Sequence, residues 1–145
     1  MKTKNKFFLL IVFLLIVING YFYIVPTFKS SDKNLENEIA ALSLHANELL
    51  QNYSANEEKS DSLYTGKVIE ITGTIKEITF LNKRNTVILN SNFETFGVIC
   101  DINPNQKEKI NQLKTHQKIR VKGICKGFLK DVILLNCSID LLTNE

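Results

Sequence analysis

The sequence predicts a mainly β domain that follows an apolar N-terminal segment. Apolar and polar residues alternate in several runs from Val68 onward, and glycines interrupt two of these runs at Gly73 and Gly123. One helical segment separates the third run from the fourth. Five strands with a single helix in this position are the order of the OB-fold, a small, partly open Greek-key barrel. We therefore expect an OB-fold barrel over residues 62–145.

The N-terminus predicts a membrane anchor. Lys2, Lys4 and Lys6 precede the stretch from Phe7 to Val25, which contains no charged residue. As a helix it would approach the ~30 Å thickness of a bilayer's hydrocarbon core. We expect residues 1–6 to form a basic cytoplasmic tip and residues 7–25 an uncleaved, single-pass signal anchor in the inner membrane. The rest of the chain would then be extracytoplasmic. Secretion after signal cleavage is the alternative, although no A-x-A-like cleavage site follows.

Charge argues against a strongly basic binding surface. The formal net charge is +3, and the three lysines before the apolar stretch account for all of it. The remainder of the chain is therefore neutral. Domains that bind nucleic acid usually carry a clear positive excess, so composition favours other partners.

Residues 26–61 are expected to contain a tether and an amphipathic helix. Apolar residues at spacings of three, four and seven predict a helix from Lys33 to Tyr53, with this stripe: Leu35, Ile39, Leu42, Ala46, Leu49, Leu50 and Tyr53. The stripe would pack against the open end of the barrel or bind a second copy of the chain. A second, short helix is expected to end near Gly66.

The barrel strands follow in order. The predicted strands are Val68–Ile78, Thr86–Leu89, Phe96–Ile102, Lys118–Cys125 and Asp131–Ile139, with a helix at Pro104–Leu113. Gly73 and Gly123 lie within strands, where glycine allows the strong coiling that a small barrel requires. An SH3-like barrel and an open α+β sheet are the alternatives, and the position of the helix argues against the first.

From about Leu49 to Ile139 the chain resembles a bacterial family, the tRNA-anti-like OB-fold proteins. The stretches that carry the resemblance are Leu63-Tyr64-Thr65-Gly66-Lys67, Ile71-Thr72-Gly73-Thr74-Ile75, Val98-Ile99-Cys100, Val121 to Gly127, and Asp131 to Cys137. The resemblance implies an OB barrel behind a signal sequence, a lipoprotein signal or a membrane helix, in an envelope protein or lipoprotein. No cysteine follows the apolar segment here, so we do not expect lipidation.

Two loops and one strand supply the candidate ligand-binding residues. OB-folds bind ligands on their second and third strands and on the loops after strands one and four. The candidates at these places are Phe80, Lys83, Arg84, Phe96, Lys126, Phe128 and Lys130. In a single-strand binder the rings would stack on bases and the cations would follow phosphates. In the alternative interpretation, which we favour, Phe80 and Phe128 plug the ends of the barrel and the lysines are solvated.

Three cysteines, Cys100, Cys125 and Cys137, lie in apolar runs. An extracytoplasmic location permits a disulfide, and the odd count leaves at least one thiol unpaired. The sequence leaves three alternatives open: no bridge, a Cys100–Cys137 bridge, and a Cys125–Cys137 bridge.

No motif points to catalysis. His45 and His116 have no nucleophile or carboxylate at motif spacing, so we expect no catalytic residue, cofactor or metal site. The sequence predicts a non-enzymatic module that binds a protein, peptide or saccharide, with an envelope protein as partner or self-association through the 33–53 helix. The alternative is a single-stranded nucleic-acid-binding protein that uses the loops after strands one and four.

Overall fold

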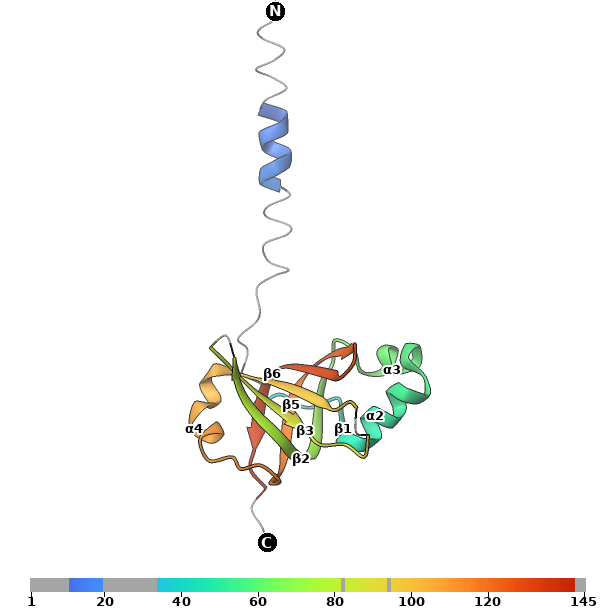
Figure 1. The fold of residues 1–145 in the computed structure, drawn as a ribbon. Helices are drawn as coiled ribbons and strands as arrows, with labels where there is room; N and C mark the ends of the chain where they lie inside the picture. The colour runs from blue at the N-terminus through green and yellow to red at the C-terminus, as the bar shows by residue number, and fades with distance from the viewer. Residues whose placement is uncertain (1–10, 20–33, 82, 94, 143–145) are drawn as a thin grey trace, which may run out of the picture. The chain divides into compact units, whose positions relative to one another are not determined.

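The computed structural model describes most of the chain, namely residues 11–19, 34–81, 83–93 and 95–142. The chain divides into two compact units, Met1–Ser31 and Asp32–Glu145, which we describe separately. Figure 1 shows the ribbon and its element labels.

The first unit contains one described helix, over residues 11–19. The predicted anchor, residues 7–25, extends beyond this helix at both ends, and residues 7–10 and 20–25 lie outside the described part of the chain. Where the structure describes the chain, no helix combines the length and the apolar character that crossing a membrane requires.

In the second unit five strands close into a barrel, which confirms the predicted OB-fold. They are β2 (Val68–Leu81), β3 (Arg84–Leu89), β4 (Val98–Ile102), β5 (Lys118–Phe128) and β6 (Val132–Asp140). The strands neighbour one another in the order β2-β3-β4-β6-β5, and β5 pairs back onto β2. Only β4 and β6 run parallel within this closed circuit.

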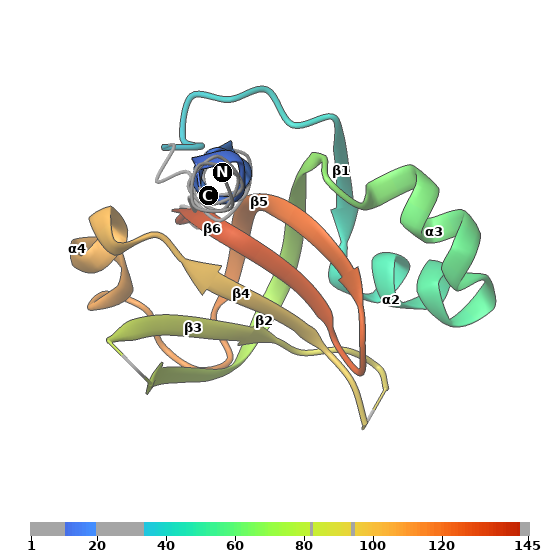
Figure 2. The ribbon, with the colours of Figure 1, turned by 90° about the horizontal axis from the view of Figure 1, so that it is seen from above.

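Helices lie on two sides of the barrel. The predicted helix between the third and fourth barrel strands is present, as the 3-10 turn η1 (Pro104–Gln106) followed by α4 (Lys107–Ile110). Helices α2 (Ala46–Ala55) and α3 (Glu57–Tyr64) precede the barrel in the chain. Figure 2 shows α4 on one side of the barrel and α2 with α3 on the other.

The amphipathic helix predicted over residues 33–53 is wrong in its first half. Residues 34–41 are not helical, and β1 (Leu42–His45) is a strand that pairs in parallel with β2. The alternation of leucine with polar residues in Leu-Ser-Leu-His suits a strand. Only residues from Ala46 onward form a helix, and Ile39 in the predicted stripe is 92% exposed.

Strand pairing explains why β1 forms. β3 pairs with β2 only from Ile75 onward, while β5 pairs with the first half of β2, from Val68 to Thr74. Without a further partner, the other edge of the first half of β2 would present unpaired backbone N–H and C=O groups. β1 covers this edge, pairing Leu42–His45 with Ile69–Thr72.

The apolar face of α2 packs on the molecule's own core. Leu49, Leu50 and Tyr53 are buried there together with inward-facing strand residues. Self-association through a continuous 33–53 helix therefore has no structural basis, since that helix does not exist and the buried part of its stripe is already covered.

The two mid-strand glycines sit where backbones come close. A Cβ at Gly73 would lie 3.1 Å from the Cβ of Ala46, at the start of α2. A Cβ at Gly123 would lie 2.5 Å from the Sγ of Cys137 on the paired strand β6. β6 bulges beside this contact, because Asn136 has a φ of 57° and the register with β5 and β4 shifts there.

Candidate binding groove beside the β2–β3 hairpin

The loop after β2 is a tight hairpin. Leu81 pairs with Arg84, so two residues connect the strands. Lys83 has a φ of 63°, the left-handed region that two-residue hairpins favour. The turn therefore fixes Phe80, at the end of β2, and Arg84, at the start of β3, on either side of Lys83.

These three predicted site residues come together in one groove. It has a volume of about 450 Å³ and is lined by Phe80, Lys83, Arg84, Asn85, Ile102, Pro104, Lys107 and Asn111. We call it the hairpin groove. Phe80 is 68% exposed. It does not plug the end of the barrel, so the interpretation of Phe80 as a plug is wrong.

The hairpin groove carries an uneven distribution of charge. Arg84 forms a bidentate ion pair with Asp101 on β4. Its Nε lies 2.8 Å from Oδ1 of Asp101, and its Nη2 contacts Oδ2. Lys83 and Lys107 are exposed and have no ion-pair partner among the described residues. The groove thus combines an open aromatic ring with two cations that are free to meet a negative group.

Lys107 was not among the predicted site residues. It lies in the first turn of α4, far from the hairpin in sequence. No sequence pattern marks it, because its position in the groove depends on how α4 packs beside the hairpin.

The second predicted loop has a different environment. Phe128 at the end of β5 packs against Tyr53 of α2, with ring centroids 5.7 Å apart, and meets Phe96 edge-on at 5.9 Å. Phe96 stacks on Phe93 at 4.5 Å, and Tyr53 lies 5.9 Å from Tyr64. These five rings form one aromatic cluster, in which Phe96 and Phe128 are half-buried and each contacts two other rings.

Hydrogen bonds anchor the aromatic cluster to the helices. The buried hydroxyl of Tyr53 donates to Asp61 at 3.2 Å and lies 3.4 Å from the hydroxyl of Thr65. Burial raises the pKa of Tyr53 well above its ordinary value. Lys126, near the end of β5, and Lys130, in the turn after it, are exposed and do not line the hairpin groove.

The cysteines lie inside the barrel. All three thiols are free and fully buried in this structure. Burial, together with a hydrogen bond to Cys100, raises the pKa of the Cys137 thiol. A neutral, inaccessible thiol is a poor nucleophile. No cluster of three or more metal-ligating side chains occurs within the described residues.

Comparison with known proteins places this geometry in a family. A model of the tRNA_anti-like family matches residues 1–139. The chain belongs to the tRNA_anti-like family. No curated protein matches the chain.

Solved structures are similar to this chain at low sequence identity. One is a "putative nucleic acid-binding lipoprotein" from Klebsiella pneumoniae, with a TM-score of 0.56 and 15% identity over 67% of this chain and 90% of that one. Another is the S. pombe Stn1-ten1 complex, with a TM-score of 0.44 and 15% identity over 53% of this chain and 59% of that one. A third is an OBody bound to hen egg-white lysozyme, with a TM-score of 0.46 and 12% identity over 56% of this chain and 85% of that one. The likeness to the first of these concerns the fold alone.

Proposed function

We propose that this tRNA_anti-like protein is a non-enzymatic binding module that holds an extended, acidic segment of a partner protein in the hairpin groove. The observation that carries the proposal is Phe80, an exposed ring with Lys83 and Lys107 lining the same groove. An apolar side chain of the partner would cover the ring. Carboxylates beside it would pair with the two lysines, which have no partner of their own among the described residues.

The outer face of the neighbouring strands favours protein over nucleic acid. Along β3 and β4, residues alternate between buried and half-buried, so Ile88 and Ile99 face outward. They pair directly with one another, and Ile99 pairs with Ile133 of β6. This row is aliphatic, whereas single-strand binders stack bases on aromatic rings. The rings of Phe93 and Phe96 are already engaged in the aromatic cluster.

Binding of defined probes by the full-length protein, purified in detergent, tests the proposal. The probes are a fluorescent ten-residue peptide of alternating Glu and Leu, its Lys and Leu counterpart, and a ten-nucleotide oligo(dT). We expect the acidic peptide to bind best. Phe80→Ala should weaken its binding by about tenfold, the equivalent of ~1.4 kcal/mol. The pair Lys83→Gln and Lys107→Gln should have a comparable effect that diminishes at high salt.

Lys126→Gln with Lys130→Gln is the matched control, since it removes the same charge from the end of β5 and the turn after it, which do not line the groove. Equal loss in this control and in the groove variants would contradict the proposal. Preference for oligo(dT), weakened by changes in both loops, would establish nucleic-acid binding instead.

We also propose that residues 7–25 anchor the module in the inner membrane with its barrel outside the cytoplasm. Support comes from the uncharged stretch and from the three lysines that precede it. Protease added to spheroplasts should digest the barrel while leaving a cytoplasmic marker intact. A barrel that survives until the membrane is lysed would contradict this location. A shortened mature chain released to the medium would show cleavage and secretion.

A further inference from the structure

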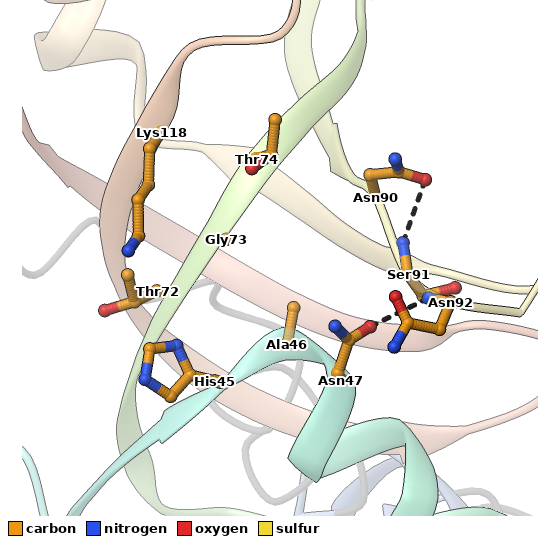
Figure 3. A pocket seen from close by; sticks show the side chains of 10 residues that line it. All are labelled: His45, Ala46, Asn47, Thr72, Gly73, Thr74, Asn90, Ser91, Asn92 and Lys118. Atoms are coloured by element: carbon orange, nitrogen blue, oxygen red, sulfur yellow. Dashed lines mark hydrogen bonds between the residues drawn. The ribbon is translucent and has the colours of Figure 1, made fainter.

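A second cavity lies away from the hairpin groove, between β2 and the start of α2. It measures about 270 Å³ and is lined by His45, Ala46, Asn47, Thr72, Gly73, Thr74, Asn90, Ser91, Asn92 and Lys118. Figure 3 shows Lys118 and His45 on one side of it and the three asparagines on the other. We call it the asparagine pocket.

Close packing forms the floor of the asparagine pocket. Gly73 has no side chain, and a Cβ there would come within 3.1 Å of Ala46 and of Leu89. The start of α2 can therefore lie directly over β2. A larger residue at either position would separate the helix from the strand and change the shape of the pocket.

Hydrogen bonds fix the opposite wall. The backbone N–H of Asn92 donates to Oδ1 of Asn47 at 2.8 Å, and the N–H of Asn90 donates to the carbonyl of Thr74 at 2.7 Å. Ser91 donates to the carbonyls of Phe93 and Phe96. The loop over residues 90–92 is thus held against both α2 and β2, and the pocket is pre-formed.

The side chains that face the pocket keep unused hydrogen-bonding capacity. The described contacts occupy only Oδ1 of Asn47 and Oδ1 of Asn90, which leaves both NH2 groups as donors. The hydroxyls of Thr72 and Thr74, the Asn92 amide, the His45 ring and the Lys118 ammonium have no partner among the described residues. His45 is the N-cap residue of α2, but its side chain makes no capping hydrogen bond. Among the residues that the structure describes, no carboxylate lines the pocket.

We propose that the asparagine pocket binds one anionic sugar unit. Amides and hydroxyls that both donate and accept match the hydroxyls of a sugar, which also do both. The Lys118 ammonium, which no described carboxylate of the pocket lining opposes, would hold the acidic group. The volume lies just below the ~300 Å³ at which pockets for drug-sized ligands begin, which suits a single sugar ring.

This site is independent of the hairpin groove. The two cavities share no lining residue. Phe80→Ala should therefore weaken peptide binding and leave sugar binding intact. Lys118→Gln should weaken binding of the anionic sugar and leave peptide binding intact.

Titration of the full-length protein, followed by NMR, tests the proposal. The probes are glucuronate, glucose 6-phosphate, glucose and inorganic phosphate. We expect glucuronate or glucose 6-phosphate to bind in the millimolar range and more tightly than glucose or phosphate, and their ranking identifies the acidic group. Lys118→Gln should weaken the anionic sugar by about tenfold, ~1.4 kcal/mol, and leave glucose unchanged. Thr74→Val, which keeps the shape of the side chain, should weaken all sugars.

Lys126→Gln is the control, because it removes a lysine from the same strand, β5, outside the pocket. The proposal would be overturned if neither glucuronate nor glucose 6-phosphate bound. It would also be overturned if the sugar affinities were unchanged in both Lys118→Gln and Thr74→Val. Phosphate binding as tight as either anionic sugar would also overturn it and show a simple anion site. If Lys118→Gln lowers the melting temperature of the protein, the effect of Thr74→Val on sugar affinity decides whether the proposal holds.

Discussion

Two loops that look alike in the sequence have opposite environments in the structure. Each combines a phenylalanine with two cations: Phe80 with Lys83 and Arg84, and Phe128 with Lys126 and Lys130. Phe80 is 68% exposed in the hairpin groove, whereas Phe128 stacks on Tyr53 within the aromatic cluster. Figure 2 shows helices α2 and α3 on one side of the barrel and the single turn of α4 on the other.

The difference shows that contacts with residues distant in the chain decide whether an aromatic ring beside a loop is covered or exposed to solvent. Phe128 is covered because a helix that precedes the barrel places Tyr53 over it. In the described part of the chain, the helical elements beside Phe80 are η1 and the four residues of α4, and Phe80 is 68% exposed. The covered side stabilises the fold, and the open side is available for binding.

The largest expected effect separates the two rings directly. Phe128→Ala should lower the free energy of unfolding by roughly 3 kcal/mol, because it opens a cavity in the aromatic cluster. Phe80→Ala should change it by less than about 0.5 kcal/mol, since an exposed ring makes few contacts. Urea unfolding of both variants measures the contrast. Equal losses would show that the two sides are packed alike.

A second substitution tests how tightly the wall of the barrel is packed. Gly123→Ala should cost about 1–3 kcal/mol, because the new methyl group would meet the Sγ of Cys137. Cys137→Ala removes that sulfur, so the double variant should recover part of the loss in a double-mutant cycle. If the losses of unfolding free energy in the two single variants simply add in the double variant, the new methyl group does not clash with the Sγ of Cys137.

Alkaline pH should lower the stability of the fold through the buried Tyr53 of the aromatic cluster. The pKa of Tyr53 is raised by burial, so the folded state holds the phenolic proton at pH values where the unfolded chain, with a pKa near 10, has released it. Stability is then fully present below about pH 10 and falls as pH rises towards the folded-state pKa. Tyr53→Phe should flatten this part of the stability profile. An unchanged profile would show that Tyr53 does not titrate with unfolding.

The smallest expected effect belongs to the ion pair in the open groove. Arg84→Gln and Asp101→Asn should each change stability by about 1 kcal/mol or less, because the arginine is half exposed and solvent screens the pair. A double-mutant cycle on urea unfolding measures the coupling energy. A coupling well above that value would mean that this side also contributes strongly to the fold.

The sequence predicted the barrel well because strand alternation and glycine positions are local signals. All five strands, and the helix at Pro104, occur where the pattern placed them, with ends that differ by a few residues. The helix over residues 33–53 failed because a spacing of three and four also arises by chance across a loop and a strand. The two-residue alternation from Leu42 to His45 was the stronger local signal there.

The candidate site could be predicted only in part. Sequence order alone brings Phe80, Lys83 and Arg84 together, since a two-residue turn joins them. It could not add Lys107 or separate Phe128 from the site, because both depend on contacts between segments distant in the chain. The asparagine pocket was missed for the same reason. Its three asparagines look like ordinary turn and helix residues until α2 packs over Gly73.

Site-specific photocrosslinking in intact cells tests the central claim, that the hairpin groove beside Phe80 binds a partner protein and the loop after Phe128 does not. A benzoylphenylalanine replaces Phe80 in one strain and Leu129 in another, and Leu129 is equally suitable because it is 86% exposed in the opposite loop. We predict a discrete, protease-sensitive and nuclease-resistant adduct from position 80 and none from position 129. Adducts from position 129 alone, or adducts that nuclease removes, would contradict the account.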